Sequence, residues 1–171
     1  MILTPIKCPI NGQMRELMVD PRTSLLELLR SEGLTSINQA CAVGECGACT
    51  ALIDGIPIDT CIFLAVWADG KTICTAEGEV KDGTISQVQQ AYVDTGAVQC
   101  GFCTPGLVMT TTALVEKYKG QQLCRDTIRR ELAGNLCRCT GYEKVIDAVL
   151  ASVDNKPGCD GQGGCGGCKH E

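Results

Sequence analysis

The chain has 171 residues, of which 44 % are apolar, so it is long enough to bury one compact core or two small ones. Its formal net charge is −5, and its Lys and Arg residues are scattered, which excludes the basic stripe of a nucleic-acid-binding protein. No run of about eighteen apolar residues occurs and the first residues do not resemble a signal peptide, so we expect a cytoplasmic protein without a membrane span.

The first predicted unit is a small α+β domain. Residues 6–10 and 15–19 are strand-like and flank Asn11-Gly12, a dipeptide typical of a type I′ hairpin turn. Ser24 and Glu27 then form a capping box in front of a leucine-rich helical face, which predicts a helix that ends near residue 33. We expect this helix to pack on the hairpin.

A Gly- and Cys-rich loop, residues 40–49, follows this helix and has no helical or strand period. Glycine reaches positive φ at little cost, so such a loop can fold tightly and point its N–H groups at sulfur. Residues 50–53 and 56–58 predict a second hairpin around Asp54-Gly55, just before Cys61. We therefore expect one domain to close one metal site.

The cysteines of this domain form a first set, whose spacing is C-x4-C-x2-C with a distant fourth cysteine. In a reducing compartment cysteine-rich patterns favour metal binding over disulfides. The spacing is that of plant-type [2Fe-2S] ferredoxins, whereas zinc sites usually pair their ligands in two short hairpins. An iron-sulfur cluster is the stronger prediction and structural zinc the alternative, and the set comprises Cys41, Cys46, Cys49 and Cys61.

From about residue 84 the pattern becomes helical, which places a domain boundary near residues 77–83. Thr84 and Gln87 predict a capping box for the first helix, and Thr104-Pro105 predicts the cap and first turn of the second, which should end near residue 119. Residues 126–132 and 143–153 have apolar faces and complete four helices. We expect an all-α four-helix domain.

A second set of four cysteines lies in the connections between these helices. It has the spacing C-x2-C and C-x-C, and the two connections can meet at one end of the bundle. This spacing by itself does not separate zinc from an iron-sulfur cluster. The set comprises Cys100, Cys103, Cys137 and Cys139.

The end of the chain, residues 157–171, is a Gly-rich tail with three more cysteines, Cys159, Cys165 and Cys168. With His170 they offer four soft or borderline ligands on a flexible backbone, so an extra metal centre, zinc or iron-sulfur, is one interpretation. The alternative is a disordered tail that binds metal adventitiously. The isolated cysteines Cys8, Cys74 and Cys124 are expected to be small buried apolar residues.

Three strings in this order resemble the iron-sulfur subunit of the xanthine oxidase family of molybdenum hydroxylases. They are residues 44–50 (GECGACT), residues 99–106 (QCGFCTPG) and residues 134–142 (GNLCRCTGY). The resemblance covers about residues 6–153 and includes both cysteine sets. The tail departs from the family pattern, which ends near the last helix.

The resemblance implies a fold of class α+β, in which an N-terminal plant-type ferredoxin-like (β-grasp) domain is followed by an all-α four-helix domain. The domains would be residues 1–78 and 79–156, each with one [2Fe-2S] cluster, followed by the tail. It also implies a large partner subunit with the molybdopterin cofactor and a medium subunit with FAD. In that family the equivalents of Gln99 and Cys100 contact the pterin, by the amide and by the sulfur respectively.

The resulting expectation is the electron-transfer subunit of an oxidoreductase complex, xanthine dehydrogenase-like, which relays electrons from molybdopterin to FAD. His170 is the only histidine, which excludes a Rieske cluster and leaves no base for a cysteine nucleophile in the folded halves, so the subunit alone should lack substrate chemistry. The alternative is a free-standing ferredoxin-like carrier or a regulatory metal-binding module. A cluster in the tail would add a further redox protein as a partner.

Aromatic residues near the cysteine sets receive structural roles. Phe102 and Tyr142 are expected to pack beside the second set, where an apolar wall limits solvent access. Trp67 is expected to fill the core of the first domain.

Overall fold

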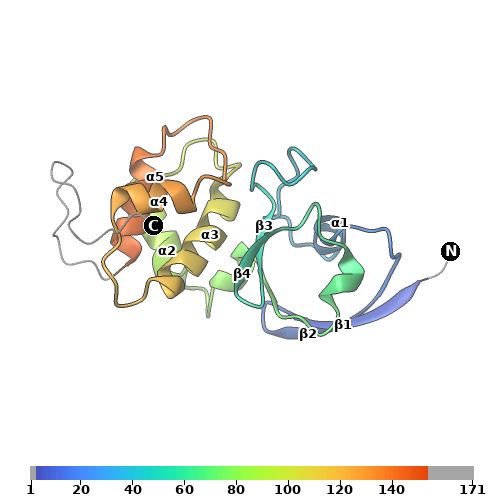
Figure 1. Cartoon of the computed structure of the whole chain (residues 1–171). Coiled ribbons are helices and arrows are strands. Elements are labelled where there is room, and N and C mark those ends of the chain that lie inside the picture. The colour runs from blue at the N-terminus through green and yellow to red at the C-terminus, as the bar shows by residue number, and fades with distance from the viewer. Residues whose placement is uncertain (1–2, 154–171) are drawn as a thin grey trace.

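The computed structural model describes residues 3–153, so the cysteines predicted as an extra metal centre in the tail lie outside the described residues (Figure 1). The first half is a mixed sheet with one helix, and the second half is helical. In chain order the elements are β1 (Thr4–Ile10), β2 (Gln13–Val19), α1 (Leu25–Ser31), β3 (Thr50–Ile53), β4 (Ile56–Asp59), η1 (Ala65–Ala68), β5 (Ile73–Cys74), η2 (Ala76–Glu79), α2 (Gln87–Asp94), α3 (Thr104–Lys117), α4 (Arg125–Glu131) and α5 (Glu143–Ser152).

Both predicted hairpins are confirmed. β1 and β2 pair antiparallel with Ile10 opposite Gln13, and β3 and β4 pair with Ile53 opposite Ile56, so each turn has two residues. Asn11 and Gly12 have φ values of 50° and 79°, as a type I′ turn requires. The sheet order is β2-β1-β5-β3-β4, in which β1 and β5 are parallel.

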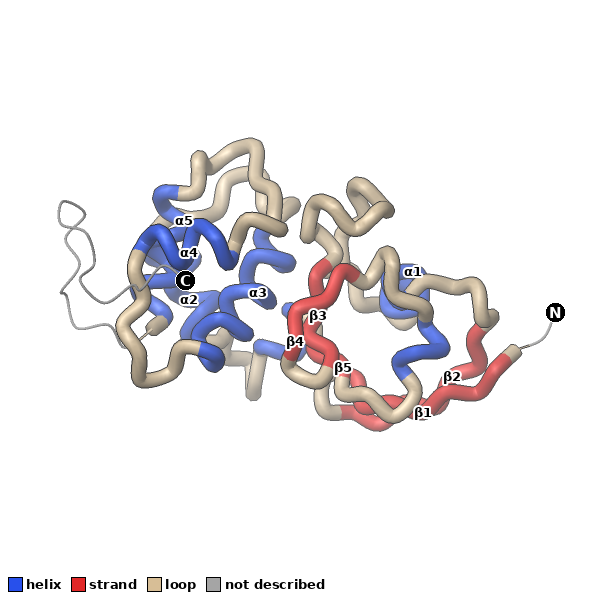
Figure 2. Tube along the Cα trace, in the orientation of Figure 1, coloured by secondary structure: helices blue, strands red, loops and turns tan. Residues whose placement is uncertain are grey.

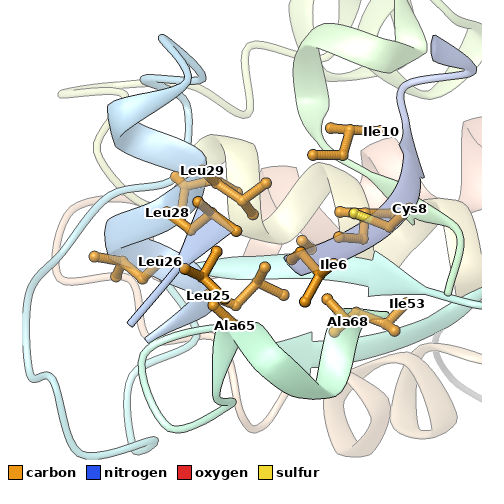
Figure 3. Close-up of a cluster of buried hydrophobic side chains, with 14 of the residues drawn as sticks. Ile6, Cys8, Ile10, Leu25, Leu26, Leu28, Leu29, Ile53, Ala65 and Ala68 are labelled. Atoms are coloured by element: carbon orange, nitrogen blue, oxygen red, sulfur yellow. The ribbon is translucent and has the colours of Figure 1, made fainter. Parts of the chain in front are cut away.

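The core of the first half lies between this sheet and α1. The predicted capping box is present, because the Ser24 hydroxyl accepts from the Glu27 N–H and the Glu27 carboxylate accepts from the Ser24 N–H. Leucines of α1 meet alternate residues of β1, and Cys8 is buried among them (Figure 3). Trp67, by contrast, is 56 % exposed, so its prediction as core filler was wrong. It lies edge-on against Phe63 at the surface.

The second half contains the four helices α2 to α5 around a core that includes Tyr92, Leu107 and Ile146. Two predicted capping residues were wrong, although the first-turn proline of α3 is confirmed. The capping box of α2 is formed by Ser86 and Gln89, because residues 81 and 84 pair as an isolated bridge and keep Thr84 outside the helix. α3 begins at Thr104 itself, without a side-chain cap.

The corrected start of α2 makes a prediction about stability. Ser86→Ala should lower the free energy of unfolding by about 1 kcal/mol, because it leaves the Gln89 N–H without its acceptor. Thr84→Ala is the matched control and should change it by less than about 0.5 kcal/mol, because Thr84 is exposed outside the helix. Urea unfolding of both variants measures the difference, and equal losses would contradict the assignment of the cap.

The two halves pack against each other through α3 and the β3–β4 hairpin (Figure 2). This contact brings the start of α3 close to the loop that precedes β3. Within residues 3–153 no helix is long and apolar enough to cross a membrane.

Candidate iron-sulfur sites

The first cysteine set lies on the loop before β3 and just after β4. Its thiols form two interacting pairs: Cys46 acts on the ionisation of Cys41, and Cys61 acts on that of Cys49. Cys49 is buried, whereas the other three are partly exposed. None of the eleven cysteines in the described part of the chain forms a disulfide.

Backbone N–H groups of the loop point at the first pair. The N–H groups of Val43 and Glu45 lie 3.5 and 3.4 Å from the Cys41 sulfur. These donors, with Cys46, lower the pKa of Cys41 to about 6, so the thiolate that iron requires is the favoured form at neutral pH. Ala42 and Gly44 have positive φ, which curves the backbone around the sulfur as the glycine-rich sequence predicted.

Cys49, in the second pair of the first set, has the opposite character. Burial raises the pKa of Cys49 to about 12, and the neighbouring Cys61 and Asp59 add to the effect. A thiol of this kind ionises only when a metal replaces the proton, so binding of iron at Cys49 must release its proton.

The second cysteine set comes together from two connections, as predicted. The sulfurs of Cys100 and Cys139 lie 3.6 Å apart, and the thiols of Cys103 and Cys137 form the other interacting pair. Cys100 also acts electrostatically on Cys103, and Cys137 on Cys139, so the two pairs of this set lie near each other.

In the second set, Cys137 is the cysteine whose pKa is lowered. Burial opposes its ionisation, but the Thr140 hydroxyl, which donates to the sulfur at 3.1 Å, and nearby backbone donors lower the pKa overall. Burial raises the pKa of Cys103 to about 12, with Cys137 as a further cause. Each set therefore contains one thiol whose pKa is lowered, Cys41 or Cys137, and one whose pKa burial raises to about 12, Cys49 or Cys103.

The pairing of sulfurs fits a two-iron cluster better than a single ion. In a [2Fe-2S] cluster each iron takes two protein ligands, so four sulfurs should fall into two pairs. Both sets show this pattern, and the 3.6 Å between the sulfurs of Cys100 and Cys139 is far longer than the roughly 2.05 Å of a disulfide. Within residues 3–153 no three Cys, His, Asp or Glu side chains converge as ligands of one metal ion would.

The side chain of Tyr142 stabilises the loop of the second set by hydrogen bonds to its backbone. Its hydroxyl accepts from the Cys137 N–H at 2.8 Å and donates to the Asn135 carbonyl at 3.0 Å. Tyr142 itself has φ 67°, next to Gly141 at 62°, and this left-handed stretch turns the ring back under the loop. The expected packing role of Tyr142 was therefore incomplete, because the ring also supplies hydrogen bonds.

Removing this hydroxyl should weaken the second site. Tyr142→Phe leaves the Asn135 carbonyl and the Cys137 N–H without their partner, which costs about 1–3 kcal/mol where such groups are buried. We expect faster release of iron to a chelator from the second site alone. Tyr118→Phe is the control, because its hydroxyl bonds Glu131 and touches neither set. Equal release rates for the two variants would contradict this role.

The structure places Gln99 and Cys100 on the surface, and Cys139 is exposed beside them. Cys103 and Cys137, the other pair of the set, are partly buried. The second set therefore has one end open to a partner and one end that faces the protein. Phe102 is 48 % exposed and does not form the expected dry wall by itself.

Sequence reasoning missed Asn135 and the Thr140 hydroxyl. Both lie in the third distinctive string, residues 134–142. The string therefore marked the right region, but it did not predict the role of each side chain. The Asn135 amide bonds Gly47, which is far away along the chain, and the Thr140 hydroxyl bonds Cys137 next to the left-handed turn. No periodic sequence pattern predicts either hydrogen bond.

Comparison with known proteins agrees with this geometry. Residues 8–77 match a family model described as a 2Fe-2S iron-sulfur cluster binding domain, and residues 75–150 match one described as a [2Fe-2S] binding domain. The chain is 59 % identical over 145 residues to the xanthine dehydrogenase iron-sulfur-binding subunit of Escherichia coli O157:H7, covering 85 % of this chain and 91 % of that protein. It is 45 % identical over 150 residues to the nicotinate dehydrogenase small FeS subunit of Eubacterium barkeri, covering 87 % and 94 %.

Solved structures show the same fold. Quinoline 2-oxidoreductase from Pseudomonas putida 86 matches with a TM-score of 0.82 and 41 % identity, over 89 % of this chain and 94 % of that chain. The aldehyde oxidoreductase from Desulfovibrio desulfuricans matches with a TM-score of 0.81 and 36 % identity, over 86 % of this chain but only 17 % of that chain. The chain belongs to the small iron-sulfur subunits of the xanthine dehydrogenase-type molybdenum hydroxylases, and is a redox subunit without substrate chemistry of its own.

Proposed function

We propose that this chain relays electrons through two [2Fe-2S] clusters, from a molybdopterin centre on a large subunit to FAD on a medium subunit. The observation that carries the proposal is the sulfur pairing, which occurs in both sets. When bound, the clusters supply one-electron carriers; the protein supplies thiolates, N–H donors and limited solvent access. The proposed ligands are Cys41, Cys46, Cys49 and Cys61 for the first cluster and Cys100, Cys103, Cys137 and Cys139 for the second.

We further infer two structural domains, residues 1–78 with a β-grasp fold and residues 79–156 with four helices, followed by the tail, residues 157–171. The described sheet and helices support this division, since each half has its own buried core. A third metal centre at Cys159, Cys165 and Cys168, and an additional redox partner that it would serve, stay predictions.

The direction of the relay is supported by exposure. The open end of the second set, with Gln99 and Cys100, suits a contact with the pterin of the large subunit. The protein-facing end leads towards the first set, because the N–H of Leu136 donates to the Cys46 carbonyl at 2.9 Å. The relay thus has an entry at the surface of the helical half and a route inward.

Exposed apolar side chains beside both sets support subunit contacts. Val43 and Ile62 are 63 % and 58 % exposed beside the first set, and Phe102 and Leu136 are 48 % and 55 % exposed beside the second. Apolar residues gathered at such places are typical of protein interfaces rather than of a free surface. This favours the subunit role over the alternative of a free-standing carrier or regulatory metal-binding module.

We propose a xanthine dehydrogenase-like complex in the cytoplasm. Relatives at 41–45 % identity are named for nicotinate, nicotine and caffeine, so the small subunit does not by itself set the substrate. The relative with 59 % identity is named for xanthine, which favours xanthine as the first substrate to test.

The test combines cofactor analysis with purification from the native host. We expect iron and acid-labile sulfide for two [2Fe-2S] clusters, two distinct EPR signals after reduction with dithionite, and co-purification with molybdenum- and FAD-containing subunits. One signal together with zinc would overturn the two-cluster relay. Purification of the loaded chain alone would favour the free-standing carrier. Iron beyond two clusters, lost on Cys165→Ser, would establish the tail centre.

A further inference from the structure

One buried side chain connects the loops of the two cysteine sets. Asn135, which lies just before Leu136 and Cys137, is only 5 % exposed. Its Nδ2 donates to the Gly47 carbonyl at 3.0 Å and to the Thr50 hydroxyl at 3.2 Å, and its Oδ1 accepts from the Thr110 hydroxyl at 2.8 Å. A single amide therefore holds the first loop, β3 and α3 together.

The backbones meet at the same place. A Cβ at Gly106 would lie 2.1 Å from the Gly47 carbonyl oxygen, and a Cβ at Gly47 would lie 2.4 Å from the Asn135 Nδ2. Side chains at these positions would not fit, so both residues allow the two halves to touch through their main chains. Gly47 lies between the first-set residues Cys46 and Cys49, and Gly106 lies in the first turn of α3 just after Cys103.

The chemistry of this contact requires an amide. The side that faces Gly47 and Thr50 must donate, and the side that faces Thr110 must accept, which is what the two ends of an Asn side chain provide. An aspartate would turn a second oxygen towards the Gly47 carbonyl, where no proton lies between the two acceptors. The groups that bond the Asn135 amide are buried. A missing hydrogen bond would therefore leave a buried polar group unsatisfied, which lowers the stability of the fold.

We propose that Asn135 is a positioning residue that fixes the separation and relative orientation of the two clusters. This inference rests on the proposed function, because it concerns the step between them. Electron transfer slows steeply as donor and acceptor move apart, so a contact that joins both ligand loops controls the rate without touching either cluster. The buried amide does this from the protein-facing side of the second set.

The experiment uses the full chain with its clusters. The variants are Asn135→Ala, Asn135→Asp and Thr110→Val, the last of which removes only the hydroxyl that orients the amide. Asn38→Ala is the matched control, because the Asn38 Nδ2 also bonds across the two halves, to the Phe102 carbonyl at 2.8 Å, but at an exposed site. The readouts are iron and sulfide content, the magnetic interaction between the two reduced clusters by EPR, and the rate of electron transfer between them after rapid reduction.

We expect the Asn135 variants that retain both clusters to show a weaker magnetic interaction or broadened EPR signals, because dipolar coupling falls with the cube of the distance between the clusters. The rate of electron transfer between the clusters should be several-fold slower, because it also falls steeply with that distance. Thr110→Val should show the same change to a smaller degree, and Asn38→Ala should show none. If Asn135→Ala does not fold, Thr110→Val decides the matter.

The two levels of the proposal fail differently. A wild-type chain without two clusters overturns the proposed function. A wild-type chain with both clusters, whose magnetic interaction and intercluster rate are the same in every variant, overturns only the role of Asn135. An effect of Asn38→Ala equal to that of Asn135→Ala also overturns it, because any bond between the halves would then suffice.

Discussion

Gly106→Ala should destabilise the chain by about 2–4 kcal/mol, although the same change in an ordinary helix stabilises it by about 1 kcal/mol. Gly106 is buried in α3, and the added Cβ would lie 2.1 Å from the carbonyl oxygen of Gly47. The position of the Cβ is fixed by the backbone of α3, and the carbonyl oxygen belongs to the main chain of Gly47, so neither atom can move without a backbone shift. The substitution also displaces the carbonyl that accepts from Asn135, which adds the loss of a buried hydrogen bond.

Chemical unfolding of the loaded full chain measures this effect. Gly134→Ala is the matched control, because an added Cβ there meets nothing within 4 Å and Gly134 does not have positive φ. We expect the control to change the free energy of unfolding by less than about 0.5 kcal/mol. A Gly106→Ala chain as stable as the wild type would show that the two halves do not meet at Gly47.

Cys137→Ser should remove the second cluster and leave the first, which lowers the iron content by about half, since each [2Fe-2S] site holds the same amount of iron. Cys137 is the thiol of its set whose pKa is lowered, by donors that outweigh its burial, so it is the best thiolate of that set. A serine oxygen is a harder ligand that suits iron-sulfur chemistry poorly. Cys49→Ser should remove the first cluster in the same way, and the two variants should lose different EPR signals.

The control is a cysteine outside both sets. Cys74 lies in β5, and burial followed by the charge of Glu79 raises its pKa to about 11, so it is a protonated thiol at neutral pH. Cys74→Ser should leave iron content and both EPR signals unchanged. Full iron in Cys137→Ser, or loss of the same signal in Cys137→Ser and Cys49→Ser, would contradict the assignment of the two sets.

Much of the local structure could be predicted from sequence because short-range chemistry controls it. Both hairpins follow from Asn11-Gly12 and Asp54-Gly55, which adopt positive φ easily, and α1 follows from its capping box. The start of α2 was mispredicted because Ser86 and Gln89 compete with Thr84 and Gln87 for the same pattern. The bridge between residues 81 and 84 decides between them, and it closes a local two-residue turn in which Asp82 and Gly83 have positive φ.

Trp67 shows the limit of arguments from residue type. A large aromatic residue usually contributes to a core, yet this one lies at the surface of η1 against Phe63. The residues of the same turn that point into the core are the small Ala65 and Ala68, both fully buried.

The sequence by itself determined which cysteines belong together as two sets and that the chain is a redox subunit, because ligand type, spacing and three distinctive strings are local properties. Only the tertiary structure decided how the sulfurs pair, which end of the second set is exposed, and how Asn135 joins the two loops. These features depend on contacts between residues far apart in sequence, such as Gly47 with Asn135 and Cys100 with Cys139. Packing α3 against β3 creates the contact between Gly47 and Asn135, and the meeting of two helix connections creates the contact between Cys100 and Cys139.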